Sequence, residues 1–433
     1  MVHGPRFRTR DGSDATSRRH VPRLGWTGPR GASMSDGSES NPPTTDAHPL
    51  TRAMVLLFLL TALMSLGYGS VFTLLADIRD KYGFSDGQVG LIAFAGLFTG
   101  VLSQLFLARF SDRGYAVVMM RVGIAFAAFG MLWMSFSTAL WQWIAARLLL
   151  GLGSGMVGPA IRRIIIARDP QRVGSNLGRQ TAFDVAGFVL GPALAAGLAQ
   201  VFGLRAPFIV LTVAYVLAIF LVGRVTTAGD AAPAETSPSG RSSLLRLPAM
   251  QSALFSAIAF YLTIGMFEAL WSILLRDQGA ATWLIGLTLS LFTIPMIIFA
   301  PKGGAMAQRR GPIVIVSFSI TAAAIATFAY GIAPLWLLIA LSGIHAVADA
   351  FTMPANQVAV AMSSPPDQFA AGQGLLGATG LAIAALSALI GAAVYDAYGR
   401  GAIFTGTAVL MMVCLVIARQ RWRAQPALRD VTG

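Results

Sequence analysis

Two residues that commonly carry protons lie close together in the middle of a long apolar stretch of the sequence. His345 and Asp349 are four positions apart, a spacing that places both side chains on one face of a helix. At 1.5 Å per residue they lie roughly 16 and 22 Å from one end of that helix. A carboxylate beside an imidazole can hold or pass a proton in the physiological pH range. The pair is therefore a candidate for proton coupling, and the alternative is a buried structural pair.

Three further charged residues interrupt apolar stretches, where a charge is costly unless it has a partner or reaches water. Arg147 lies seven residues into its stretch, and Asp184 lies about nine residues into the next one. Glu268 lies eight residues before Arg276, which ends its stretch. All three are candidates for proton coupling or substrate contact. The alternative for each is structural, as a hydrogen-bonded anchor or as a carboxylate that reaches water or a neighbouring span.

Aromatic and amide side chains complete the set of expected substrate contacts. Tyr261 and Trp271 lie near Glu268 in the same stretch, and an acidic group among aromatic rings suits a cationic, apolar ligand. Tyr68 stands between two glycines, where a loosened or bent helix can face a cavity, although packing explains it equally well. Asn356 is the fourth candidate for lining a substrate cavity.

Helices that cross a membrane must position these residues. The 433-residue chain is 55% hydrophobic and 12% charged, whereas soluble domains have roughly a quarter charged residues. Its apolar stretches have about the length that crosses a bilayer, near 20 residues. We therefore predict an all-α membrane protein with twelve transmembrane helices. The predicted spans are 53–75, 88–108, 117–137, 140–166, 176–201, 206–223, 252–275, 282–301, 313–332, 335–362, 369–395 and 402–418.

Lys and Arg are distributed unevenly between the loops. Fourteen of them follow spans 2, 4, 6 and 8, and five lie in the opposite connections. Positive residues stay in the cytoplasm during insertion, so both termini and the connection between spans 6 and 7 are expected there. Arg162 and Arg163 end the fourth span on that side, which suggests a role in orientation and gating. The location predicted is a cell inner membrane, and the excess of Arg over Lys is typical of a GC-rich bacterial genome.

Two polar segments divide the chain. The N-terminal segment is rich in Gly, Ser, Pro and Arg, which predicts disorder, and Met34 within it is an alternative start of translation. The segment between spans 6 and 7 is rich in Ala, Pro, Ser and Gly, which is typical of a flexible linker. The expected parts are a cytoplasmic tail (1–50), an N-terminal bundle (51–225), a cytoplasmic linker (226–249), a C-terminal bundle (250–420) and a cytoplasmic tail (421–433).

The two halves share residues at a fixed offset. Arg113 and Arg309 are 196 positions apart, and Pro159 and Pro354 are 195 apart. Such self-similarity indicates duplication. The expected fold is therefore two pseudo-symmetric bundles of six helices.

The loops after spans 2 and 8 carry related motifs. Residues 108–114 read ARFSDRG, and residues 304–311 read GAMAQRRG. Both resemble the G-x-x-x-D-R-x-G-R loop of the major facilitator superfamily, although the first has alanine for the leading glycine and the second has glutamine for aspartate. The resemblance implies two bundles around a central site that opens alternately to each side. It also implies a gate on the cytoplasmic side that is formed by Asp112, Arg113, Arg309 and Arg310.

Glycines recur at every fourth position in the fourth and fifth spans. Gly151 and Gly155 lie in the fourth, and Gly187 and Gly191 precede Pro192 in the fifth. Small residues at this spacing let helices pack closely in a bilayer, and Pro192 removes a backbone hydrogen bond, which predicts a hinge. The fifth-span pattern resembles a signature of proton-coupled drug exporters, with two alanines where that signature has glycines.

Known enzyme motifs are missing from the sequence. It contains no G-x-x-x-x-G-K-[ST], H-E-x-x-H or G-x-S-x-G pattern. The single cysteine excludes a disulfide within the chain and a cysteine metal site. We therefore expect no enzyme activity, no cofactor, no metal site and no binding of ATP or nucleic acid.

The leading functional prediction is a secondary active transporter that couples efflux of small amphipathic compounds to protons. Its expected partners are a small-molecule substrate, protons and the lipid bilayer, and a monomer is favoured. One alternative is a proton-linked importer of a sugar or organic acid, in which arginines of the cavity bind the anion. A second alternative is a related sensor or assembly protein that transports nothing.

Overall fold

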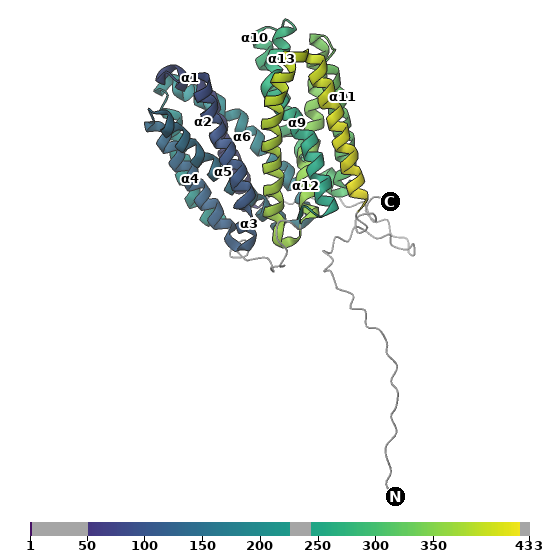
Figure 1. Cartoon of the computed structure of the whole chain (residues 1–433). Helices are drawn as coiled ribbons and strands as arrows, with labels where there is room; N and C mark the ends of the chain where they lie inside the picture. The colour runs from purple at the N-terminus through teal and green to yellow at the C-terminus, as the bar shows by residue number, and fades with distance from the viewer. Residues whose placement is uncertain (2–50, 226–243, 425–433) are drawn as a thin grey trace, which may run out of the picture. The chain divides into compact units, whose positions relative to one another are not determined.

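The computed structural model describes Met1 and residues 51–225 and 244–424, all of whose regular elements are helices. Most of the predicted tails and linker lies outside the described residues. Figure 1 shows the helices of the two halves gathered into two bundles. The long helices are α1 (Arg52–Tyr82), α2 (Asp86–Phe106), α4 (Ala116–Phe136), α5 (Leu140–Arg168), α6 (Val173–Phe202), α7 (Ala206–Val225), α9 (Pro248–Asp277), α10 (Thr282–Arg310), α11 (Pro312–Tyr330), α12 (Leu335–Ser363) and α13 (Phe369–Arg423).

Nine stretches of the described residues are long and apolar enough to cross a membrane. Two of them, Gly87–Phe136 and Pro366–Arg423, have 50 and 58 residues, far more than one crossing needs. Gly114 (φ 92°) and Gly399 (φ 77°) interrupt them with a left-handed conformation that favours glycine. Each of these stretches therefore crosses twice, and α10, with 29 residues, completes twelve crossings among the described residues.

The helix boundaries repeat at the offset found in the sequence. α1, α2, α4 and α6 begin 196 positions before α9, α10, α11 and α13, respectively. The glycines with positive φ repeat in the same way, because Gly83 pairs with Gly279 and Gly203 pairs with Gly399. The two bundles are thus built on one plan, with their turns at equivalent positions.

Local sequence signals explain several helix ends. The Thr51 hydroxyl accepts a hydrogen bond from the Met54 N–H at the start of α1, and Ser85 and Gln88 form a reciprocal capping box at the start of α2. Gly83 ends α1 in the left-handed conformation.

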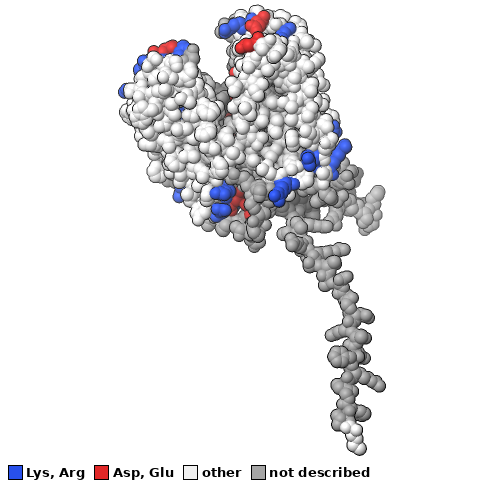
Figure 2. All heavy atoms as spheres, in the orientation of Figure 1, with Lys and Arg blue, Asp and Glu red and all other residues white. Residues whose placement is uncertain are grey.

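The outer faces of the bundles suit a hydrocarbon environment. Large apolar side chains such as Phe220 and Leu389 are more than 70% exposed, which water would disfavour. In Figure 2, Lys, Arg, Asp and Glu gather at the ends of the helices, and the sides between them are almost free of charge.

Glycines bring helices of the N-terminal bundle into close contact. A Cβ atom at Gly187 would lie 2.1 Å from the Ala62 carbonyl oxygen of α1, and one at Gly191 would lie 2.3 Å from that of Leu66. A Cβ atom at Gly151 of α5 would likewise lie 2.1 Å from a carbonyl oxygen of α2. The small residues at these crossings leave no room for a side chain, and Gly155 is similarly enclosed.

Candidate functional site

A cavity of about 340 Å³ lies between the two bundles. Helices α1, α2, α5 and α6 supply most of its lining, and α9 and α13 of the other bundle supply Glu268 and Leu381. Most of its exposed surface is apolar, several lining residues carry hydroxyl or amide groups, and the three charged ones are Arg162, Asp184 and Glu268. A mainly apolar cavity with a few polar groups is typical of a small-molecule site.

The two acidic residues of the cavity have different surroundings. Asp184 of α6 accepts a hydrogen bond from the Ser65 hydroxyl of α1 and interacts electrostatically with Arg162. Glu268 of α9 is exposed and has neither a hydrogen bond nor an ion pair with any residue that the structure describes. Glu268 thus offers a free carboxylate from the other bundle.

An aromatic wall separates Arg147 from the cavity. The Arg147 Cζ atom lies 4.1 Å from the ring centroid of Tyr68 and 4.8 Å from that of Phe72, and both rings line the cavity. Arg147 is fully buried, and its three guanidinium nitrogens have no hydrogen-bond partner among the described residues. The two rings therefore provide its main stabilising contacts, through cation–π interactions.

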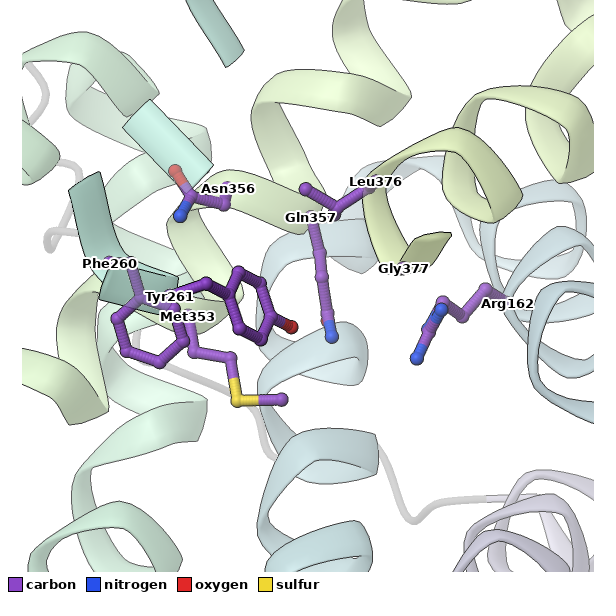
Figure 3. Close-up of a pocket in the computed structure, with 8 residues that line it drawn as sticks. All are labelled: Arg162, Phe260, Tyr261, Met353, Asn356, Gln357, Leu376 and Gly377. Carbon is purple, nitrogen blue, oxygen red and sulfur yellow. The ribbon is translucent and has the colours of Figure 1, made fainter. Parts of the chain in front are cut away.

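A second cavity, of about 20 Å³, has room for a single water molecule. Tyr261 and Asn356 line it together with Arg162, which reaches across from the other bundle (Figure 3). Asn356 accepts a hydrogen bond from the Ser256 hydroxyl. The Thr181 hydroxyl donates to Oε1 of Gln357, another lining residue, at 3.3 Å and so links α6 to α12.

The His345–Asp349 pair lies inside the C-terminal bundle. His345 Nε2 is 3.6 Å from Asp349 Oδ1, and His345 Nδ1 is 3.2 Å from the Tyr330 hydroxyl. Both side chains are almost fully buried, and neither lines the central cavity. Trp271 lies beside Tyr330 and donates from Nε1 to the Thr288 hydroxyl at 3.0 Å, so it too is set back from the cavity. Proton coupling through this pair stays a prediction.

Sequence reasoning missed the two residues that interact with Asp184 in the cavity. The sequence suggested an orientation and gating role for Arg162, but its side chain lines both cavities. Ser65, which bonds Asp184, has no distinguishing signal in the sequence. Arg162 could have been found from its position alone, because it lies three residues after Pro159, within α5 and well before its end at Arg168.

Asp112 joins the bundles on the predicted cytoplasmic side. This buried carboxylate lies in the π-helical turn Ser111–Tyr115 and accepts hydrogen bonds of 2.8 Å from the Ala370 and Ala371 N–H groups. These two N–H groups belong to the first turn of α13, where a negative charge is favourable. Arg163 Nε lies 3.5 Å from the same carboxylate.

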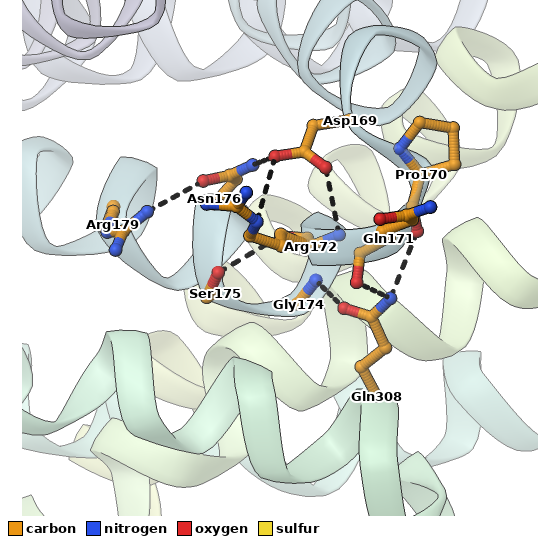
Figure 4. Close-up of polar contacts among 9 residues, drawn as sticks. All are labelled: Asp169, Pro170, Gln171, Arg172, Gly174, Ser175, Asn176, Arg179 and Gln308. Atoms are coloured by element: carbon orange, nitrogen blue, oxygen red, sulfur yellow. Dashed lines mark hydrogen bonds and ion pairs between the residues drawn. The ribbon is translucent and has the colours of Figure 1, made fainter. Parts of the chain in front are cut away.

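Gln308 makes the equivalent contact in the second half (Figure 4). Its Oε1 accepts from the Gly174 N–H at 2.7 Å, and its Nε2 donates to the Pro170 and Gln171 carbonyls at 3.1 and 3.0 Å. Asp112 and Gln308 are 196 positions apart, as are their partners Gly174 and Ala370. The two loop motifs therefore cap the first turns of α13 and α6 in the same way.

The arginines that follow Asp112 and Gln308 in the loop motifs are exposed, and they lie outside the contacts that join the bundles. Arg113 is exposed, with its Cζ 5.5 Å from the Phe110 ring centroid, and Arg309 and Arg310 are exposed as well. The contacts that join the bundles here are made by Asp112 and Gln308, and Arg163 supplies the cation at Asp112.

Glycines also bring helices of the two bundles into close contact on the predicted cytoplasmic side. A Cβ atom at Gly174 would lie 2.0 Å from the Gly304 carbonyl oxygen, and one at Gly178 would lie 2.2 Å from that of Ala300. In the other half, a Cβ atom at Gly374 would lie 2.5 Å from the Gln104 carbonyl oxygen. We propose that these glycine contacts, with those of Asp112 and Gln308, form the gate.

Protonation of Asp112 is expected to favour the closed gate. Burial raises the pKa of this carboxyl to about 7, although the N–H groups of Ala370 and Ala371 and the nearby Arg163 favour its charged form. In an open gate the carboxyl reaches water, and its pKa returns toward the usual value near 4. The closed gate therefore binds the proton more tightly. Between pH 8.5 and 5.5 the ratio of closed to open molecules should rise roughly thirtyfold.

Spin labels on cysteines introduced at the exposed positions 52 and 309 would measure this shift between closed and open gates. The readout is the distribution of distances between the two labels at each pH. Asp112→Asn should remove the pH dependence and keep the gate able to close, because Gln308 shows that a neutral amide serves at the equivalent position. An equal pH response in this variant would assign the titration to another group.

Comparisons with known proteins agree with this architecture. The family model for the Major Facilitator Superfamily matches residues 57–269 and 253–431. The chain is 25% identical over 348 residues to the multidrug resistance protein MdtG of Serratia proteamaculans, covering 75% of this chain and 81% of that protein. It is 26% identical over 242 residues to MdtG of Proteus mirabilis, covering 53% of this chain and only 57% of that protein.

Solved structures show the same fold at lower identity. The human organic anion transporter MFSD10 (TETRAN) aligns with a TM-score of 0.66 at 19% identity, over 85% of this chain and 99% of that one. A bacterial homologue of the iron transporter ferroportin, in an outward-facing state, aligns with a TM-score of 0.71 at 14% identity, over 86% of this chain and all of that one. The duplicated bundles, the paired loop motifs and the family match lead to one conclusion: this chain belongs to the Major Facilitator Superfamily of membrane transporters.

Proposed function

We propose that this transporter exports small, amphipathic, cationic compounds from a bacterial cytoplasm in exchange for protons, with both of its termini in the cytoplasm. The observation that carries the proposal is the pair of carboxylates, Asp184 and Glu268, in an otherwise mainly apolar cavity between the bundles. The relatives named as multidrug resistance proteins support the same substrate class.

Exchange follows if the proton and the cationic substrate compete for one carboxylate. A carboxylate in a low-dielectric cavity is stabilised either by a proton or by a cationic ligand. With the gate closed, the cavity exchanges protons and substrate with the opposite side of the membrane. A proton that binds Asp184 there would displace the cation, and opening of the gate would then release the proton into the cytoplasm.

Transport into liposomes tests the proposal. Purified protein should take up ethidium when the lumen is acidic, and a protonophore should stop the uptake. Glu268→Gln should raise the KM for ethidium about tenfold, because a free carboxylate is lost from the cavity, with a smaller effect on the maximal rate. No uptake of ethidium or of other lipophilic cations would overturn the proposal.

Import or export of an organic anion is the second candidate. Arg162 lines both cavities and could bind a carboxylate, and one of the similar structures is named as an organic anion transporter. Uptake of a labelled aromatic carboxylate, with no uptake of ethidium, would support this candidate. No flux of either compound would instead favour the sensor or assembly role.

A further inference from the structure

A large groove opens on the outer face of the C-terminal bundle, away from the central cavity. It measures about 700 Å³ and lies between α11 and α12, with the end of α10 at one limit. Arg310 and Ser319 are the only polar side chains among its lining residues. Phe318 is 76% exposed and Ile344 is 56% exposed, so the groove faces the hydrocarbon of the bilayer. Its volume and its apolar lining suit acyl chains.

Cations gather at one end of this groove. Lys302, Met306 and Arg310 follow one another at four-residue spacing in α10, which places them on one face of the helix, and Met306 and Arg310 line the groove. Lys302 and Arg309 are exposed beside them. No residue that the structure describes forms an ion pair with Lys302, Arg309 or Arg310. Lys302 is one of only two lysines in the whole chain.

The depth of these cations matches a lipid headgroup. Arg310 ends α10 on the predicted cytoplasmic side, and Lys302 lies two turns earlier, about 12 Å deeper along the helix. A lysine at this depth extends its ammonium toward the interface. The cytoplasmic leaflet is rich in anionic lipids, which attract such juxtamembrane cations.

We propose that this groove binds one anionic phospholipid of the cytoplasmic leaflet. Its acyl chains lie against Phe318, Ile344 and the neighbouring apolar residues of α11 and α12, and its phosphate is held by Arg310 and Lys302. The site is independent of the transported substrate. It also contacts two helices that carry candidate functional residues, because α10 carries Gln308 of the gate and α12 carries the buried His345–Asp349 pair.

Native mass spectrometry of the detergent-purified protein tests this site with two lipids of identical chains, phosphatidylglycerol and phosphatidylcholine. The wild type should bind one phosphatidylglycerol at least tenfold more tightly than phosphatidylcholine. Lys302→Gln combined with Arg310→Gln should remove that preference, because each cation should raise the affinity for the anionic lipid about fivefold. Arg52→Gln, an exposed cation at the same membrane surface in the other bundle, should leave it unchanged.

A second variant blocks the groove itself. Gly343 lines the groove, and a Cβ atom there would meet nothing within 4 Å, so Gly343→Phe should fill the space without disturbing the helices. It should lower the binding of both lipids at least tenfold. Gly406→Phe is the matched control, because Gly406 is equally open but lies in α13, outside the groove.

Three binding results would overturn the proposal, and so would one change in oligomeric state. The binding results are unchanged lipid binding in Gly343→Phe, equal binding of the two lipids by the wild type, and binding of ethidium in place of lipid. The ethidium would be assigned to this groove if Gly343→Phe abolished its binding. A dimer that dissociates in Gly343→Phe would show that a second copy of the chain occupies the groove, and it would also contradict the lipid site.

Discussion

Asp184→Asn is expected to lower proton-driven transport of lipophilic cations at least roughly a hundredfold. Removing one partner of a desolvated, hydrogen-bonded charge typically costs 2–5 kcal/mol, and an asparagine cannot carry the proton that drives exchange. The Ser65 hydroxyl can still donate to the asparagine oxygen, so the helices α1 and α6 should stay together. Initial rates of ethidium uptake under an inside-acid gradient would measure the loss.

The control for this variant is a carboxylate outside the cavity. Asp80 is exposed near the end of α1, where it pairs with Arg79, and Asp80→Asn should transport at the wild-type rate. Exchange of ethidium across the membrane in the absence of a pH gradient should survive in Asp184→Asn. If the gradient drives Asp184→Asn as well as the wild type, another group couples the proton, and the His345–Asp349 pair becomes the next candidate.

Gly174→Leu is expected to keep the gate open. A Cβ atom at Gly174 would lie 2.0 Å from the Gly304 backbone, which α6 and α10 cannot relieve without separating. Overpacking of this kind typically costs about 1–3 kcal/mol, and more where backbone must move. The equilibrium should therefore shift toward the open gate at least roughly thirtyfold. Transport should fall in parallel, because one of the two alternating states is lost.

Access to the cavity from the predicted cytoplasmic side measures this shift. Cys414 is buried and is the only cysteine of the chain, so Cys414→Ala gives a background in which Ser154→Cys labels the cavity lining. In inside-out vesicles, Gly174→Leu should speed the reaction with a membrane-impermeant maleimide. Gly197→Leu in the same helix is the control, since a Cβ atom there meets nothing within 4 Å. Slow labelling in both variants would mean that this glycine contact does not hold the gate.

The architecture was predictable because a bilayer limits what a chain can do. Apolar stretches of membrane-spanning length satisfy their backbone hydrogen bonds in the bilayer by forming helices, and the twelve predicted spans match the twelve crossings of the described residues. The 196-residue offset seen in Arg113 and Arg309 reappears in the helix boundaries and in the turn glycines. Helices extend beyond several predicted spans, as in α1 and α10, because polar ends project out of the hydrocarbon.

The candidate site was only partly predictable, because one sequence does not tell which face of each helix points to the cavity. Asp184, Glu268 and Tyr68 line the cavity, whereas His345, Asp349 and Trp271 have equally suggestive residue types but lie inside one bundle. At the gate, the sequence pointed to Asp112 and to the arginines of the loop motifs, but not to Gln308. The contacts use Asp112 and Gln308, which reach the first turns of helices 258 and 134 positions away, and the arginines that follow them are exposed.

Proton release on substrate binding tests the central claim most directly. Ethidium would be added to purified protein in weakly buffered detergent solution, with a pH-indicator dye to count protons and ethidium fluorescence to count bound ligand. Competition for one carboxylate predicts the release of about one proton per bound cation from the wild type near neutral pH, and none from Asp184→Asn. Ethidium binding without proton release at any pH between about 6 and 8 would contradict proton-coupled exchange in this cavity.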